Sequence, residues 1–91
     1  MPDPTDDQHR ARVRQKADDL RRRAADLAGS VASTEEQVAD TLEKVAEHRP
    51  PADAERLRAQ AGEARAYAAK ERRRAAEYGK RSEDDDRAGE R

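Results

Sequence analysis

An apolar stripe of regular spacing runs through the first half of this 91-residue chain. Its members follow one another at alternating intervals of four and three residues: Val13, Ala17, Leu20, Ala24, Leu27, Val31, Thr34, Val38, Thr41 and Val45. This heptad pattern is typical of helices that pack against other helices. We therefore expect an all-α protein whose first helix, from about residue 6 to 48, presents this stripe to a helical neighbour.

The start of this helix carries capping signals. The Thr5 hydroxyl is placed to cap the first turn, and Gln8, three residues on, is placed to reach back to it. Asp6 and Asp7 meet the positive end of the helix dipole. Residues 1–5 are accordingly expected to form a flexible N-terminus.

The middle of the first helix leaves two alternatives open. Gly29-Ser30 and Ser33-Thr34 are poor helix formers, and Ser33 with Glu36 could form a second capping box. The segment is then either one helix, straight or bent at Gly29, or two helices. The single heptad frame favours one continuous helix.

The sequence 48–51, His-Arg-Pro-Pro, predicts a tight turn, because neither proline donates a backbone hydrogen bond and Pro50 disfavours helical geometry before it. Proline is accepted in a first helical turn, so a second helix is expected from about residue 52 to 79. Gly79 is expected to end it in the left-handed conformation, and residues 80–91 are expected to be a disordered charged tail. The second helix carries its own heptad stripe, with Glu71 as one polar member: Ala54, Leu57, Ala61, Ala64, Ala68, Glu71, Ala75 and Tyr78.

Folding the chain back at the two prolines predicts an antiparallel helical hairpin, coiled-coil-like, with opposite charges at equal heights. The expected pairs are Asp19 with Arg81, Arg23 with Glu77, Asp26 with Arg74, and Glu35 with Arg65. Each exposed pair contributes about 0 to 1 kcal/mol, so the pairs select the register more than they stabilise it. The predicted helix-packing interface consists of Val13, Leu20, Leu27, Val31, Val38, Leu42, Val45, Leu57, Ala61, Ala64, Ala68, Tyr67 and Tyr78.

The residue types needed for catalysis or metal binding are scarce. The chain has no cysteine, its two histidines are far apart in sequence, and its glycines are isolated, so no phosphate-binding loop is present. We expect a protein that is not an enzyme and that uses no cofactor and no metal. The N-terminus lacks the basic and apolar regions of a signal peptide, and no apolar run reaches membrane-spanning length. A cytoplasmic location without membrane contact is expected.

Arginine clusters at residues 10–23 and 72–74 support an alternative function, a nucleic-acid-associated helical protein. Its contacts would come from Arg12, Arg14, Arg21, Arg22, Arg23, Arg72, Arg73 and Arg74. Against it, acidic residues interleave with these arginines, the pI is about 6.1, and no aromatic stacking platform accompanies them.

Two stretches carry a family resemblance. Residues 38–46 (VADTLEKVA) followed by Arg49-Pro50, and then residues 55–58 (ERLR) with residues 64–68 (ARAYA), resemble short uncharacterised all-helical proteins of actinobacteria. The dominance of arginine over lysine is in keeping with such a source. The resemblance implies a bacterial cytoplasmic protein and no activity, ligand or functional residue.

The amount of apolar side chain decides between a lone hairpin and an assembly. Only 33% of the residues are hydrophobic and 45% are charged, so the stripes hold few large side chains to bury. We therefore expect a non-enzymatic protein-protein interaction or structural module. Its partner is expected to be a second copy, giving a four-helix dimer, or another helical protein.

Overall fold

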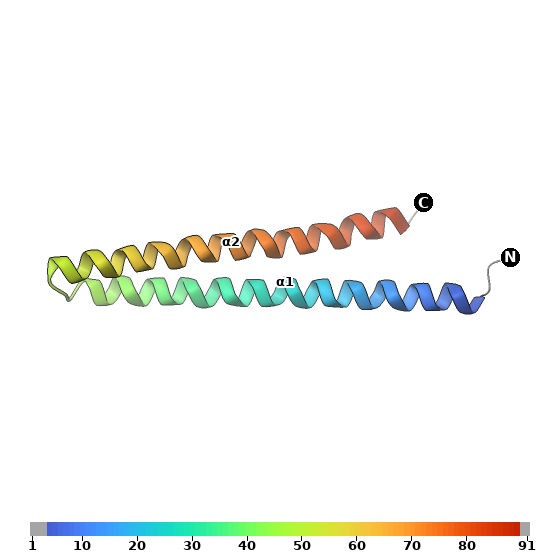
Figure 1. Ribbon diagram of the computed structural model, residues 1–91, viewed down its shortest axis with the longest axis horizontal. Coiled ribbons are helices and arrows are strands. Elements are labelled where there is room, and N and C mark those ends of the chain that lie inside the picture. Colours follow the sequence, from blue (N-terminus) through green and yellow to red (C-terminus); the bar gives the residue numbers. More distant parts are fainter. Residues whose placement is uncertain (1–3, 90–91) are drawn as a thin grey trace.

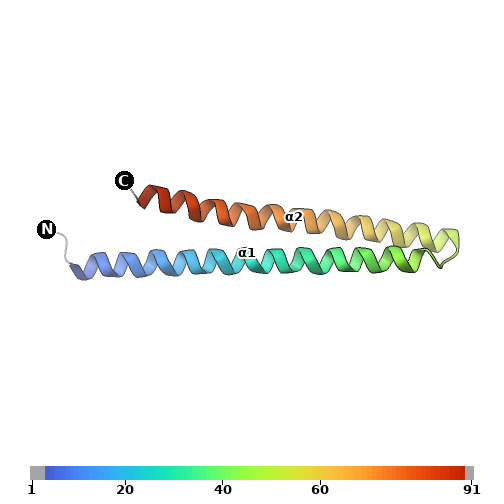
Figure 2. The same cartoon turned by 180° about the vertical axis from the view of Figure 1, so that it is seen from behind.

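The chain forms two long antiparallel helices in a computed structural model that describes the backbone of residues 4–89 and the side chains of residues 4–80. Helix α1 spans Pro4–Ala46 and α2 spans Pro51–Gly89. They lie side by side in a rod of 75 × 19 × 12 Å, close together at the turn and farther apart toward the termini (Figures 1 and 2). The all-α helical hairpin predicted from the sequence is confirmed.

Helix α1 is continuous through Gly29 and Ser33, so the alternative of two separate helices is wrong. The hydroxyl of Thr34 donates to the backbone carbonyl of Ser30 at 3.0 Å, one turn earlier in the same helix. Such a bond satisfies the hydroxyl without breaking the helix. The hydroxyl-rich middle of α1 is therefore compatible with one unbroken rod.

The start of α1 differs from the prediction. The helix begins at Pro4, so residues 4 and 5 belong to α1 and not to the expected flexible N-terminus. Proline suits a first helical turn because its fixed φ is helical and its missing N–H has no partner there. Residues 1–3 of the predicted flexible segment lie outside the described residues.

The turn between the helices is formed by residues 47–50, and α1 ends at Ala46, two residues before the predicted end. The backbone N–H groups of His48 and Arg49 donate to the carbonyls of Val45 and Ala46 at 3.1 and 3.2 Å. These three-residue bonds tighten the chain as it leaves the helix. The N–H of Ala54 then donates to the Pro50 carbonyl at 2.9 Å, which starts α2 directly after the first proline.

Helix α2 continues ten residues past its predicted end at Gly79, to Gly89. Gly79 has no positive φ, and the expected disordered tail is helical over residues 80–89. A glycine lowers helix stability by about 1 kcal/mol but does not by itself stop a helix, and no proline follows it. The rest of the expected tail, residues 90–91, lies outside the described residues.

The two helices meet along a contact made almost entirely of alanine, which we call the seam. On α2 it uses the predicted stripe, with Ala54, Ala61, Ala64, Ala68 and Glu71 buried. On α1 it uses a different stripe, whose buried members are Ala28, Ala32, Ala39 and Ala46. Half-buried Leu42 packs against the cluster of Ala39, Ala61 and Ala64. The seam is therefore narrow, and it buries small side chains.

The predicted packing stripe of α1 is thus wrong for the hairpin by one residue, which is about 100° around the helix axis. Alanine on both sides lets two helix axes come to the short end of the roughly 8 to 10 Å range, whereas valine and leucine would hold them apart. Because α2 offers mainly alanine, the alanine side of α1 fits it best.

Two interior glycines give a first prediction. Gly29 and Gly62 are both helical, neither has a positive φ, and a Cβ added at either site meets no atom within 4 Å. Gly29→Ala and Gly62→Ala should each stabilise the protein by about 1 kcal/mol, because alanine has the higher helix propensity. Thermal melts followed by circular dichroism at one fixed concentration measure this. A lower melting temperature for either variant would contradict the open surroundings of that glycine.

Candidate helix-packing interface

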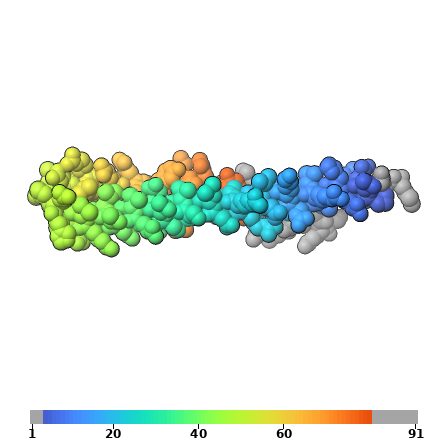
Figure 3. Space-filling model, turned by 90° about the horizontal axis from the view of Figure 1, so that it is seen from below, coloured from blue at the N-terminus to red at the C-terminus, as the bar shows by residue number. Residues whose placement is uncertain are grey.

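The large aliphatic side chains of α1 lie outside the seam. We call them the outer stripe: Val13, Leu20, Leu27, Val31, Val38 and Val45, with Ala17, Ala24, Thr34 and Thr41 between them. Leu27 is 67% exposed, Leu20 58% and Val13 55%, and Val38 and Val45 are exposed as well. Val31 is half-buried. Figure 3 shows α1 along the front of the rod with α2 behind it, and no described segment covers this side of α1. The hairpin therefore leaves its largest apolar surface uncovered.

The thirteen predicted interface residues divide into two groups of six and one separate residue, Tyr67. The structure brings six of them into the seam: Leu42, Leu57, Ala61, Ala64, Ala68 and Tyr78. The other six aliphatic residues form the outer stripe and do not join the two helices. Tyr67, on α2, is 49% exposed. The alanines that α1 contributes to the seam were missed, although their intervals of four, seven and seven residues also fit a heptad and they face a stripe of alanines.

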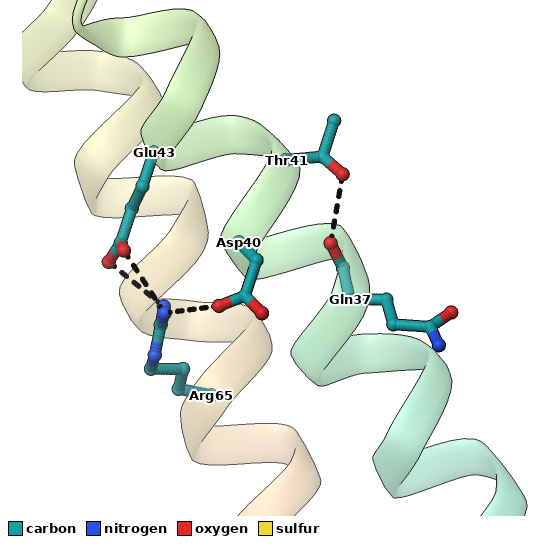
Figure 4. A network of polar contacts seen from close by, with 5 residues as sticks. All are labelled: Gln37, Asp40, Thr41, Glu43 and Arg65. Atoms are coloured by element: carbon teal, nitrogen blue, oxygen red, sulfur yellow. Dashed lines mark hydrogen bonds and ion pairs between the residues drawn. The ribbon is translucent and has the colours of Figure 1, made fainter.

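Ion pairs between the helices lie on one face of the hairpin. Arg65 of α2 donates to Asp40 at 2.9 Å and to both carboxylate oxygens of Glu43 at 2.9 and 3.0 Å (Figure 4). Arg72 donates to Glu36 at 2.7 Å. We call this the ionic face. The Arg65 side chain keeps 42% of its surface exposed, so these bonds fix the register and contribute only about 0 to 1 kcal/mol each.

The partners in these pairs differ from the predicted ones. Arg65 was expected to meet Glu35 and Arg74 to meet Asp26, but Arg65 binds Asp40 and Glu43, and Arg74 binds Glu71 of its own helix at 3.3 Å. Arg23 and Glu77 also form no pair within the described part of the chain. The expected partner of Asp19, Arg81, has its side chain outside that part. A long arginine reaches diagonally along the neighbouring helix, so equal height does not select its partner.

The outer stripe and the ionic face lie on opposite sides of the seam. Glu36, Asp40 and Glu43 each follow a seam position by one residue, whereas Val31, Val38 and Val45 each precede one. One residue is about 100°, so the two sets point in nearly opposite directions. Figure 4 shows Thr41 and Gln37 on the side of α1 away from Arg65. The hairpin thus has one charged face and one face that carries the outer stripe.

A surface hollow of about 370 Å³ lies on the stripe face near the turn. Apolar Val45 and Leu57 form part of its lining, and Arg49, Asp53, Arg56 and Gln60 form the rest. The hollow lies between the two helices, because Val45 belongs to α1 and Leu57 to α2. This end of the stripe face is therefore concave, and it is lined by apolar and charged side chains together.

The arginines proposed for nucleic-acid contact do not form one surface. Arg72, Arg73 and Arg74 are consecutive in a helix and so point in three directions about 100° apart. Four of the proposed arginines bind carboxylates: Arg21 with Asp18 at 3.2 Å, Arg22 with Asp19 at 3.4 Å, Arg72 with Glu36 and Arg74 with Glu71. Arg12, Arg14, Arg23 and Arg73 are exposed. This intramolecular pairing opposes a continuous phosphate-binding track.

Among the side chains of residues 4–80, Glu71 is the one carboxylate buried in the seam, with 7% of its surface exposed. Its charge is met by Arg74 at 3.3 Å, one turn along the same helix. The alanines of α1 leave room for its aliphatic part, as a long side chain can bury its stem while its charged end reaches solvent or a partner. Glu71 is therefore a seam residue whose charge is paired locally.

Other kinds of site are not indicated by the described side chains. Within residues 4–80 no group of three histidine, cysteine or acidic side chains is arranged to hold a metal ion. Neither helix, over the part that the structure describes, has a segment apolar enough to span a bilayer. The outer stripe, flanked by the hollow at Val45, is thus the most distinctive surface on the molecule.

Comparison with known proteins adds no relative. Models of protein families, curated proteins and solved structures were compared with the chain, and none of the three comparisons gave a match. The resemblance to actinobacterial helical proteins stays a prediction, and function has to be argued from the outer stripe itself.

Proposed function

We propose that this protein is a non-enzymatic helical module that associates with a second copy of itself through the outer stripe, giving a four-helix dimer of the coiled-coil type. The observation that carries the proposal is the exposure of valine and leucine at every second or third turn of α1 while alanine fills the seam. Burying one such side chain stabilises by about 1.5 to 3 kcal/mol. A dimer would gain the free energy of burying these large apolar side chains, which the alanine seam does not contain.

The polar atoms of the outer stripe do not oppose its burial. The Thr34 hydroxyl donates to the Ser30 carbonyl and the Thr41 hydroxyl to the Gln37 carbonyl, each at 3.0 Å. A buried hydroxyl without a partner costs about 1 to 3 kcal/mol, and this cost is avoided here. A partner that covers both threonines therefore leaves neither hydroxyl without a hydrogen bond. The bonded threonine hydroxyls therefore support burial of the outer stripe in a contact.

The expected properties of the protein in solution follow from this proposal. Light scattering should give twice the 10.2 kDa mass of the chain in the micromolar range. The melting temperature followed by circular dichroism should rise with protein concentration, because association stabilises the folded state by mass action. A mass of one chain, together with a melting temperature that does not change with concentration, would contradict self-association. The bacterial and cytoplasmic setting is part of the same proposal and rests on the sequence alone.

A further inference from the structure

The outer stripe matches itself when one copy is reversed. Read backward, its intervals of four and three residues are the same, so an antiparallel partner places Val13 opposite Val45, Leu20 opposite Val38, and Leu27 opposite Val31. The small members then also meet, with Ala17 opposite Thr41 and Ala24 opposite Thr34. Large side chains face large ones and small face small along about 48 Å of helix. A contact that uses one patch on both copies is the interface type of a twofold dimer.

Charge distinguishes this arrangement from a parallel one. Residues 10–23 hold seven basic and two acidic side chains, whereas residues 35–48 hold five acidic side chains and one lysine, Lys44. An antiparallel pair sets the basic segment of each α1 beside the acidic segment of the other. A parallel pair in register sets like charge beside like charge over both segments. Complementary potentials select orientation in this way.

The segments of α2 that lie beside these two parts of α1 do not cancel the difference in charge between them. Residues 53–66 lie beside the acidic part of α1 and hold three acidic and three basic side chains. Residues 78–89 lie beside the basic part and hold four acidic and three basic side chains. With α2 included, the segments near the turn therefore carry a net charge of −4 and the segments near the termini +4. Reversal of one copy brings these oppositely charged segments together.

The stripe face is also large enough for a stable contact. The rod is at most 19 Å across its two helices, and the stripe runs for about 48 Å, so the face covers at most roughly 900 Å². Stable protein interfaces cover about 800 Å² on each partner. We infer that two copies pack face to face and antiparallel along α1, with Leu27 and Val31 of both chains at the centre. This inference rests on the self-association proposed above.

Disulfide trapping tests the orientation, and the chain offers a clean background because it has no cysteine. The variants Val13→Cys and Val45→Cys are made singly, since both positions are exposed in the hairpin. They lie about 48 Å apart in one helix, so a bond between them has to join two chains. Each variant is oxidised alone and in an equal mixture, and tryptic mapping identifies the linked peptides. Ala66→Cys, at an exposed position on α2, measures random collision.

The expected result is a link between Val13→Cys and Val45→Cys chains in the mixture, at least tenfold more abundant than the links of either variant alone. Homotypic Val13→Cys links in a dimer of normal mass would overturn the antiparallel orientation and leave self-association standing. Links no more abundant than those of Ala66→Cys, again in a dimer, would mean that another face forms the contact. A single-chain mass for the parent protein would overturn both inferences.

Discussion

Leu27→Gln should convert the dimer into single chains at concentrations where the parent protein is associated. Leu27 is 67% exposed in the hairpin, so the substitution removes almost nothing from the fold of one chain. In the dimer it removes a central apolar contact twice, once from each copy. At about 1.5 to 3 kcal/mol for each buried leucine, the dissociation constant should rise by roughly 10² to 10⁴-fold. Sedimentation equilibrium over a range of concentrations measures that shift.

A matched variant separates association from general effects of glutamine. Ala66→Gln places the same new side chain at an exposed position on α2, away from the outer stripe, and should leave the dissociation constant unchanged. Leu27→Gln should also melt at a lower temperature than Ala66→Gln, and the difference should narrow at high protein concentration. If the two variants dissociate alike, Leu27 lies outside the contact and the outer stripe is not the dimer interface.

The sequence was sufficient for the hairpin because its signals are local and mutually consistent. The stripe from Val13 to Val45 keeps one heptad frame, and Pro50-Pro51 interrupts the helix just after that stripe ends. Each of these features acts within a few residues, as do the propensity and hydrogen-bonding terms that determine a helix. Two antiparallel helices joined at residues 47–50 follow from them.

The choice of stripe on α1 did not follow from the sequence of α1, because two adjacent stripes obey the same spacing. One carries Leu27, Val31 and Val38, and the other carries Ala28, Ala32 and Ala39. Hydrophobicity alone favours the stripe with Leu27 as the packing side of α1, whereas the fit to the side chains of α2 favours the stripe with Ala28. The size of the facing side chains on α2 settles it, since Ala61 and Ala64 admit close approach. Side-chain volume across the contact is a tertiary property that periodicity does not contain.

The end of α2 was predicted wrongly for a different reason. The prediction treated a single residue, Gly79, as sufficient to stop the helix. Gly79 matches the residue type of a helix stop, but a stop also needs the left-handed conformation and a chain that turns away. Gly79 stays helical, and the charged residues after it continue α2 to Gly89. A cost of about 1 kcal/mol at one glycine is small against ten further residues of helical hydrogen bonding.

The alanine seam gives the second large effect, which concerns the hairpin itself. Ala61 is 0% exposed and touches Ala39, also 0% exposed, so no space is left for a larger side chain. Ala61→Leu should destabilise the protein by about 1 to 3 kcal/mol, because three added carbons have to push the helix axes apart or adopt a strained rotamer. Chemical denaturation followed by circular dichroism measures the loss.

Ala59→Leu supplies the control, two residues away on the same helix and exposed. Leucine and alanine differ little in helix propensity, so this variant should stay within about 0.5 kcal/mol of the parent protein. The difference between the two variants then reports the closeness of the helices and not the chemistry of leucine. Widening the seam at Ala61 should also lengthen the reach from Arg65 to Asp40 and Glu43, since these bonds cross the same contact. Equal stability of Ala61→Leu and Ala59→Leu would show that α1 and α2 do not pack through their alanines. The outer stripe of α1 would then have to pack against α2 instead.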